Sequence, residues 1–291
     1  MKRFMIMLAA ALGLAAAAYL LCPRPDLDAA RPSSRAFFDS RGRLLRLTLA
    51  ADDRYRLPCL LEGIAPRLVQ ATLLYEDRDF YRHGGVDVMA LARAFWATYI
   101  QRTRRMGAST IAMQVARMHW RLRTGTLPGK LLQILRALQL TRHYSKDEIL
   151  EAYLNRAPYG GNIEGIQAAS LVYFNKTADQ LSLPEALTLA VVPQNPVHRN
   201  PATALGLTNL RPARQHLLAR WLEIHPRDHA LKTFFDLPLA VRPADRLPFD
   251  APHFIDYLQS DPSSSNGAII HTTLDVRTQR VVASLVRDHI A

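Results

Sequence analysis

The sequence predicts a mainly α-helical protein with a small β-hairpin near its start. From residue 60 onward the apolar residues recur at the helical period through most of the chain. Short apolar runs that are typical of strands occur only near the two ends. The 291 residues are enough for one large domain, or for two smaller ones, with a substantial core.

The first predicted element is an apolar helix over Phe4–Cys22. This segment carries no charge, and as a helix it spans roughly 28 Å, about the thickness of a bilayer core. Lys2 and Arg3 precede it, which predicts a cytoplasmic N-terminus. The end of the segment offers neither a small-residue cleavage site nor a good lipid-attachment site. An uncleaved transmembrane anchor over residues 1–22 is therefore favoured over a cleaved signal peptide, a lipid anchor or a buried helix.

The chain has a formal net charge of +12, and its two cysteines, Cys22 and Cys59, make neither a disulfide framework nor a metal site. A protein that an anchor holds outside the cytoplasm is not expected to bind nucleic acid. Anionic lipid headgroups or a phosphate-bearing lipid are better partners for the positive charge. Much of that charge is clustered, at Arg102, Arg104, Arg105, Arg117, Arg121, Arg123 and Lys130.

After the anchor, residues 23–55 are predicted to form a polar spacer and then a β-hairpin around the turn at 39–42. The helical period predicts helices over residues 66–75, 86–101, 109–120, 130–143, 145–154, 164–174 and 184–192. Ser145 and Glu148 form a capping box at the start of one of them. The apolar helix over 86–101 is either a core helix or a membrane-surface helix.

The remaining sequence divides the chain. Proline-rich, irregular sequence occupies residues 193–201 and 237–252, and the polar run 261–267 is a linker. A strand over 268–274 and a helix capped by Asp275 follow it. The predicted organisation is an anchor (1–22), a spacer with hairpin (23–55), a main domain (56–225), a linker (226–267) and a final segment (268–291).

Two runs carry the strongest functional signal. Glu76–Gly85 reads Glu-Asp-Arg-Asp-Phe-Tyr-Arg-His-Gly-Gly, and Gly107–Gln114 reads Gly-Ala-Ser-Thr-Ile-Ala-Met-Gln. The first offers a carboxylate that can take a proton, and the second offers a helix start that can hold an anion. Together they predict one catalytic cleft.

Three neighbours of Glu76 have more ordinary explanations. Asp77 could orient Glu76, bind a cation or make a structural hydrogen bond. We expect His83 to be a structural partner of the turn rather than a catalyst, and Phe80 to lie in the core.

These runs and three later ones resemble the five motifs of peptidoglycan glycosyltransferases, glycosyltransferase family 51. Gly129-Lys-Leu-Leu-Gln133 stands where the third motif belongs. Residues 149–155, with Tyr159-Gly160, match the fourth, and residues 190–196, with Asn200-Pro201, match the fifth. The resemblance covers about residues 33–225 and is greatest to the penicillin-binding protein 1C branch.

The resemblance implies a lysozyme-like, bilobal glycosyltransferase domain that polymerises lipid II into β-1,4 glycan strands and releases undecaprenyl diphosphate. Glu76 would be the base that deprotonates the acceptor hydroxyl. The implied substrate-binding residues are Ser109, Thr110, Gln114, Arg117, Lys130, Gln133 and Asn155. No protein metal site is implied, although Mg²⁺ or Mn²⁺ could accompany the diphosphate.

The implied surroundings are those of cell-wall synthesis. The partners would be lipid II, the growing glycan strand and the lipid bilayer, with other cell-wall synthesis proteins as further candidates. The chain would cross the inner (cytoplasmic) membrane once, with its catalytic domain on the periplasmic side.

The third motif departs from the family pattern. Gln133 replaces its glutamate and Gly129 its arginine, while Met113 in the second motif is a substitution seen in the 1C branch. A diphosphate leaves readily without a proton, unlike the leaving group of a two-carboxylate glycosidase. We therefore hypothesise that Gln133 keeps a hydrogen-bonding role and that the enzyme remains active.

The end of the chain resembles the entry into the transpeptidase domain of bifunctional penicillin-binding proteins, at residues 269–282. Neither Ser-x-x-Lys nor Lys-Thr-Gly occurs in the sequence, and the Ser-x-Asn match at 264–266 falls in the polar linker. No penicillin-reactive serine is expected, so the chain looks like a natural truncation or a fragment.

Two other classes of function stay open. A glycan-cleaving enzyme of the same fold would need a proton donor and would act on finished peptidoglycan. A non-catalytic scaffold would bind glycan or partner proteins and would not depend on Glu76.

Overall fold

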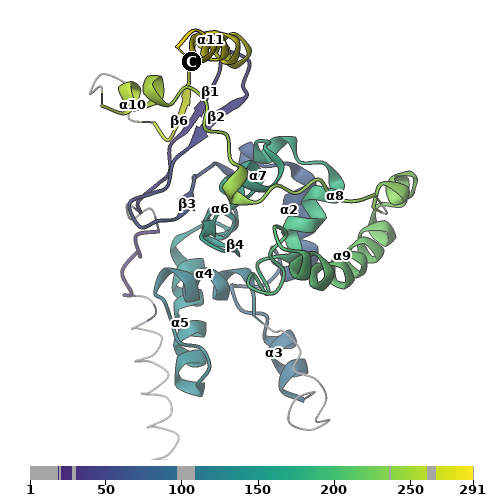
Figure 1. Ribbon diagram of the computed structural model, residues 1–291. Helices are drawn as coiled ribbons and strands as arrows, with labels where there is room; N and C mark the ends of the chain where they lie inside the picture. The colour runs from purple at the N-terminus through teal and green to yellow at the C-terminus, as the bar shows by residue number, and fades with distance from the viewer. Residues whose placement is uncertain are drawn as a thin grey trace, which may run out of the picture. The chain divides into compact units, whose positions relative to one another are not determined.

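The computed structural model describes residues 19, 21–27, 31–96, 109–235, 237–260 and 267–290. Helices dominate this part of the chain, which confirms the predicted class. The chain forms two compact units, the first from residues 1–29 and 79–152, the second from residues 30–78 and 153–291. Each unit is described by itself (Figure 1).

The first unit is helical. It contains α3 (Val88–Phe95), α4 (Ile111–His119), α5 (Leu127–His143) and α6 (Lys146–Arg156), which runs on past the boundary at residue 152. Asp87, Thr110 and Thr126 cap the first three, because each side chain accepts a hydrogen bond from the backbone N–H three residues on. The predicted capping box is confirmed by the reciprocal bonds between Ser145 and Glu148. Helices α4 and α5 pack side by side (Figure 1).

The start of the predicted spacer is fastened to the end of α5. The Gln139 amide donates to the Pro23 carbonyl at 2.8 Å, and the backbone N–H of Leu27 donates to the Tyr144 hydroxyl at 3.1 Å. The Arg24 guanidinium lies over the Tyr144 ring at 4.6 Å. Residues 21–27 are thus part of the packed unit.

Exposed apolar residues on α3 and α5 help to decide whether the predicted helix over 86–101 is a core helix or a membrane-surface helix. In α3, Val88 and Met89 are 70% and 68% exposed, so its described part is not a core helix. In α5, Leu127 and Leu135 are also exposed. Residues 97–108, with three of the clustered arginines, and most of the predicted anchor lie outside the described residues. Within the described ranges, no helix combines the length and apolarity needed to cross a membrane.

The core of the second unit is built from α2 (Pro66–Glu76), α7 (Ile166–Phe174), α8 (Leu183–Val191) and α9 (Ala204–Ile224). Helix α2 packs against both α8 and α9 (Figure 1). Every residue of α7 is buried, as expected for a helix that is apolar on all sides. Helix α9 is absent from the predicted helices, and Gly206 and Pro212 within it weaken the sequence signal.

The predicted hairpin is confirmed. Strands β1 (Ala36–Phe38) and β2 (Leu44–Leu47) pair antiparallel. Strand β6 (Ile269–His271) adds to β1 in parallel, with Ala36 opposite Ile269. Helices α10 (Pro252–Ser260) and α11 (Val276–Ile290) complete a small core of Phe37, Leu45, Ile255, Ile270 and Val276. The final segment therefore packs with the N-terminal hairpin, and α10 lies inside the predicted linker.

A second sheet corrects the prediction that strands occur only near the ends. Its order is β3 (Tyr55–Arg56), β5 (Ile163–Glu164) and β4 (Pro158–Gly160). Glu164, predicted to begin a helix, lies in β5 because it pairs with the buried guanidinium of Arg56 at 2.9 Å. Gly165, at φ +86°, then lets the chain turn into α7. Short 3₁₀ helices occur at Leu61–Gly63 (η1), Ala178–Gln180 (η3), Pro226–Phe235 (η4) and Ala244–Arg246 (η5).

Candidate active site

Glu76 is the last residue of α2 in the second unit. Its side chain is half-buried, and its Oε1 atom is fully shielded from solvent. The following residue, Asp77, is 8% exposed, and its backbone N–H closes the helix on the Leu73 carbonyl. The first motif therefore places a carboxylate at a helix end, partly withdrawn from water.

A hydrogen-bonded group adjoins Glu76 in sequence and space. The Tyr75 hydroxyl donates to Gln194 Oε1 at 2.7 Å, and the Arg199 guanidinium donates to both at 2.8 and 3.0 Å. Burial raises the pKa of Tyr75, although Arg199 opposes this shift, and Glu76 raises it further. Tyr75 is thus a neutral donor that is fixed beside the carboxylate.

Tyr159 is a second tyrosine near Glu76. It is 1% exposed, and burial raises the pKa of Tyr159 far above its ordinary value, with electrostatic interactions with Cys59 and Glu76 adding to the shift. Its carbonyl accepts a hydrogen bond from the Tyr173 hydroxyl at 2.8 Å. Two tyrosines whose phenol groups stay neutral therefore lie near the Glu76 carboxylate.

The side chain of Asn155, from the fourth motif, makes hydrogen bonds within the second unit. Its Oδ1 accepts from the backbone N–H of Cys59 at 3.0 Å, and its Nδ2 donates to the Cys59 carbonyl at 2.8 Å. This pair of bonds clamps the segment before α2. A direct contact of Asn155 with substrate stays a prediction.

In the first unit, the turn at Gly85 supports the start of α4. The Thr110 hydroxyl donates to the Gly85 carbonyl at 2.6 Å and caps α4 by accepting from Met113 N. Gly85 has φ +98°, and a Cβ there would lie 2.6 Å from the Thr141 side chain, so only glycine fits. Thr110 is 3% exposed, and its side chain acts as a helix cap. A substrate contact of Thr110 stays a prediction.

The structure confirms that Phe80 lies in the core and that His83 is a partner of the turn, whereas the expectation that His83 is not a catalyst stays a prediction. Phe80 is fully buried. The His83 ring accepts from Gly85 N at 3.2 Å, and its carbonyl accepts from the Lys146 ammonium at 2.6 Å. Both residues hold the turn.

Lys130 links the second and third motifs. Its ammonium donates to Ser109 Oγ at 2.7 Å and to Gln133 Oε1 at 2.9 Å. Gln133, 2% exposed, donates through Nε2 to the Met113 carbonyl at 2.7 Å. This chain of bonds joins α5 to α4 and presents Ser109 and Lys130 next to the N-terminus of α4, where the helix dipole favours an anion.

Arg117 and Gln114 extend the same set along α4. Arg117 is exposed in the last turn, and Gln114 is 8% exposed. Partial burial lowers the pKa of Lys130, and the positive charge of Arg117 lowers it further. Arg117 is therefore near enough to Lys130 for their positive charges to repel one another.

Gly129 explains why the family's arginine is missing from the third motif. A Cβ at this position would lie 2.0 Å from the Arg123 carbonyl oxygen, because the loop before α5 crosses its first turn there. The backbone N–H of Gly129 also completes the Thr126 cap. No side chain fits at this position unless the loop moves.

A divalent cation finds few ligands here. The described residues hold no group of three or more His, Cys, Asp or Glu side chains that is arranged to bind a metal ion. Gln133 and Lys130 present an amide and an ammonium at the third motif, whereas Mg²⁺ and Mn²⁺ prefer carboxylates. The residues at this motif do not fit a protein-held metal.

The structure thus groups the predicted residues into two sets. Ser109, Lys130 and Gln133 are directly bonded, with Thr110, Gln114 and Arg117 on the adjoining helix, all in the first unit. Glu76 and Asn155 belong to the second unit. The prediction missed Tyr75 and Tyr159 as neighbours of Glu76, although they lie beside or within motif residues, and it missed Arg199 as the partner of Tyr75.

Comparison with known proteins gives the family. Residues 42–221 match the model of the family described as transglycosylase. The chain belongs to the transglycosylase family. The matched residues include Glu76 and all seven predicted substrate-binding residues.

Relatives of this transglycosylase are longer proteins. It is 46% identical to penicillin-binding protein 1C of Escherichia coli over 154 residues, which are 52% of this chain and 20% of that protein. It is 31% identical to penicillin-binding protein 1A of Aquifex aeolicus over 264 residues, 86% of this chain and 35% of that protein. A crystal structure of penicillin-binding protein 1A from Haemophilus influenzae aligns with 86% of this chain and 28% of its own, at 18% identity and a TM-score of 0.42. The transglycosylase chain spans about a fifth to a third of these relatives.

Proposed function

We propose that this protein is a peptidoglycan glycosyltransferase that polymerises lipid II into β-1,4-linked glycan for cell-wall synthesis. The observation that carries the proposal is the bonded set Ser109–Lys130–Gln133 within a transglycosylase-family chain that also retains Glu76. The Ser109–Lys130–Gln133 set can bind a diphosphate, and Glu76 can take a proton. The chemistry requires both in one catalytic cycle.

Glu76 is the proposed general base. It takes the proton from the 4-hydroxyl of the acceptor lipid II as that oxygen attacks the anomeric carbon of the donor glycan. The bond from this carbon to the diphosphate oxygen breaks, and the configuration inverts to give the β linkage. The shielding of the Oε1 atom from solvent supports this role, because a carboxylate that is partly withdrawn from water can take a proton from a hydroxyl bound beside it.

The leaving diphosphate requires positive charge rather than a proton. Lys130 uses two of its three N–H bonds on Ser109 and Gln133, which leaves one for a diphosphate oxygen. Arg117 and the N-terminus of α4 supply further positive potential. Gln133 holds the ammonium in place through a neutral amide, so the charge of Lys130 remains available to the substrate.

We further propose a lysozyme-like, bilobal domain that works at the outer face of the inner membrane. The two compact units support two lobes, and the predicted anchor over residues 1–22 supports the attachment. The exposed apolar residues Val88 and Met89 on α3, with Leu127 and Leu135 on α5, support contact of the first unit with lipid. Lipid II, the growing strand and the bilayer would be its partners, with other cell-wall synthesis proteins as further candidates.

The deciding experiment is glycan synthesis from purified lipid II by the full chain, by Glu76→Gln and by Glu62→Gln. Glu62 is an exposed glutamate in η1 and serves as the matched control. We expect the control to retain the wild-type rate and Glu76→Gln to lose at least ~100-fold. Retained synthesis in Glu76→Gln, or no synthesis by the wild type, would contradict the proposal.

A second assay separates the alternatives. The same three proteins are incubated with purified sacculi, and soluble muropeptides are measured. Release by the wild type without glycan synthesis would identify a glycan-cleaving enzyme. Binding of glycan strands by wild type and Glu76→Gln alike, with neither activity, would identify a scaffold.

A further inference from the structure

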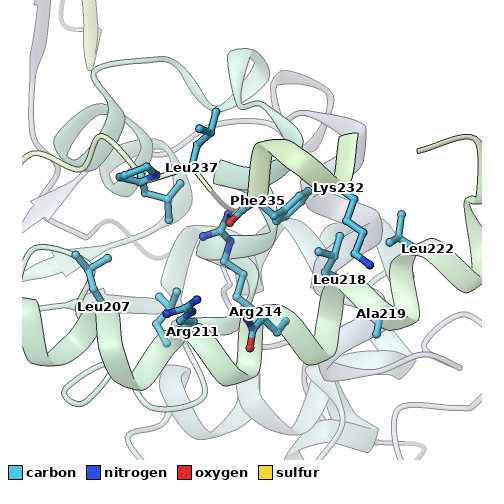
Figure 2. A pocket seen from close by; sticks show the side chains of 13 residues that line it. Leu207, Arg211, Arg214, Leu218, Ala219, Leu222, Lys232, Phe235 and Leu237 are labelled. Carbon is cyan, nitrogen blue, oxygen red and sulfur yellow. Dashed lines mark hydrogen bonds between the residues drawn. The ribbon is translucent and has the colours of Figure 1, made fainter. Parts of the chain in front are cut away.

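The second unit contains a cavity that the proposed glycan synthesis does not use. It lies between one face of α9 and described residues at 232–235 and 237–239, and its volume is about 520 Å³ (Figure 2). This size falls in the range of small-molecule pockets, about 300–1,000 Å³. Its lining includes neither Glu76 nor any predicted substrate-binding residue.

The outer wall of the cavity is tied to the rest of the second unit by two hydrogen bonds. At one end, the Trp221 indole donates to Asp228 at 2.8 Å, which ties η4 to α9. At the other end, Arg242 N donates to the Tyr173 carbonyl at 2.9 Å, which ties the chain to α7. These two bonds, together with the packing of η4 on α9, hold the described wall residues in place around the cavity.

The lining is apolar in its floor and basic at several points. Leu207, Leu210, Leu218 and Leu222 lie along one face of α9, because their spacings of three, eight and four residues are close to whole turns. The opposite wall adds Phe235, Leu237, Pro238 and Leu239. Arg211, Arg214 and Lys232 also line the cavity, whereas the described lining residues include no aspartate or glutamate.

Arg214 is the central basic residue. It is half-buried and reaches from α9 toward Phe235, where its guanidinium lies 5.0 Å from the ring centre (Figure 2). Its Nη2 also donates to the Phe235 carbonyl at 3.5 Å, so both contacts hold the guanidinium against the opposite wall. The positive charge of Arg214 is thereby fixed at the lining of the cavity, where it attracts an anionic head group.

We propose that this cavity binds an anionic amphiphile, a single hydrocarbon chain that ends in a carboxylate or phosphate. The leucine-rich floor would hold the chain, and Arg211, Arg214 and Lys232 would hold the head. Apolar area and positive charge occur together here, and neither an uncharged hydrocarbon nor a bare anion would use both. Because α9 packs on α2, the helix that ends at Glu76, occupancy of the cavity also stabilises the support of that helix.

The test uses the full chain in a nonionic detergent and a fatty acid that carries a photoreactive diazirine in its tail. After irradiation, adducts are mapped by peptide mass spectrometry. We expect labelling of peptides within 207–239, displaced by decanoate and by decyl phosphate but not by decanol or inorganic phosphate at equal concentration. In the double variant Arg211→Gln/Arg214→Gln, the yield of labelled peptide should fall by about tenfold or more.

Two further variants keep the result decisive. Arg227→Gln removes an exposed arginine of η4 that does not line the cavity, and it should label like the wild type. Leu218→Phe fills the floor while keeping all three cations, and it should also lose labelling. Thermal unfolding of each variant checks that it is folded. Equal labelling of the wild type and the double variant would overturn the proposal, as would displacement by phosphate alone or by an acidic peptide but not by decanoate.

Discussion

Lys130 and Gln133 are joined by a 2.9 Å hydrogen bond from the ammonium to the amide oxygen. The amide orientation is fixed, because Lys130 can only donate and the Met113 carbonyl, 2.7 Å from the other end, can only accept. Glutamine meets both neighbours at once. A glutamate here would direct a carboxylate oxygen at a carbonyl oxygen.

Restoring the family's glutamate should therefore not improve this protein. We expect Gln133→Glu to lower the free energy of unfolding by about 1–3 kcal/mol, because a buried oxygen meets an oxygen. Its rate of glycan synthesis should equal or fall below the wild-type rate. Urea unfolding and lipid II polymerisation measure the two effects.

Gln139→Glu is a matched control for this prediction. Gln139 also lies in α5, accepts from Arg136 at 2.6 Å and donates to the Pro23 carbonyl at 2.8 Å. It should lose similar stability without a loss of rate per folded molecule. A large gain in rate in Gln133→Glu would show that the glutamine is a handicap.

Arg117 should set the alkaline limit of the reaction through Lys130. Burial and Arg117 hold the pKa of Lys130 below its ordinary value of 10.5. The protonated ammonium is the form that binds a diphosphate, so kcat/KM should fall as the pH rises through this lowered pKa. Arg117→Gln removes the repulsion and should move the alkaline limb of the pH profile to higher pH.

The position of the limb is the informative quantity, since Arg117→Gln also weakens substrate binding at every pH. Arg123→Gln, an exposed arginine in the loop before α5, should leave the limb in place. An unchanged limb in Arg117→Gln would show that Lys130 does not control the profile.

Asp39 should make the hairpin region sensitive to acid. It is 1% exposed, accepts from the backbone N–H groups of Arg41 and Arg43, and pairs with the Arg43 side chain. Burial alone would raise the pKa of Asp39, but these bonds outweigh it and lower the pKa from 3.8 to about 2. The lowered pKa means that the stabilisation is complete above pH 4 and is lost as the pH falls toward 2.

We expect Asp39→Asn to be less stable at neutral pH, with the difference from the wild type shrinking between pH 4 and pH 2. Chemical denaturation at several pH values measures it. Asp256→Asn, at an exposed pair with Arg46, is the control and should cost little, because exposed pairs contribute little. A pH-independent difference for Asp39→Asn would refute the linkage.

The two adjacent glycines of the first motif should respond differently to alanine. Gly85→Ala should cost about 1–3 kcal/mol, because Gly85 has a positive φ and a Cβ would clash with Thr141. Gly84→Ala should be nearly neutral, since nothing lies within 4 Å of the added Cβ. Thermal unfolding compares the two, and equal losses would contradict the steric argument.

The sequence predicted the parts of the fold that follow local chemistry. The capping box at Ser145 and the turn that makes the hairpin are both encoded within a few residues. The second sheet was missed, because the helical character of residues 164–174 hides a strand residue whose partner, Arg56, is remote in sequence. Helix α9 was missed because Gly206 and Pro212 break its pattern.

The site was predicted unevenly for a similar reason. The resemblance to the family's third motif identified Lys130 and Gln133, whose bonds the structure shows. It gave no role to Arg199, which reaches Tyr75 only through the folding of the chain. The glycine at position 129 seemed a departure until the Arg123 carbonyl explained it.

The sheet that joins β1 to β6 has a consequence for biosynthesis. Next to this sheet, the backbone N–H of Val276 donates a hydrogen bond to the Asp39 carboxylate. The two residues are 237 positions apart in the sequence. At a translation rate of about 5–20 residues per second, the free edge of β1 waits on the order of ten seconds or more for its partner strand. During that interval the nascent hairpin exposes an unpaired edge, which is open to pairing with other extended chains.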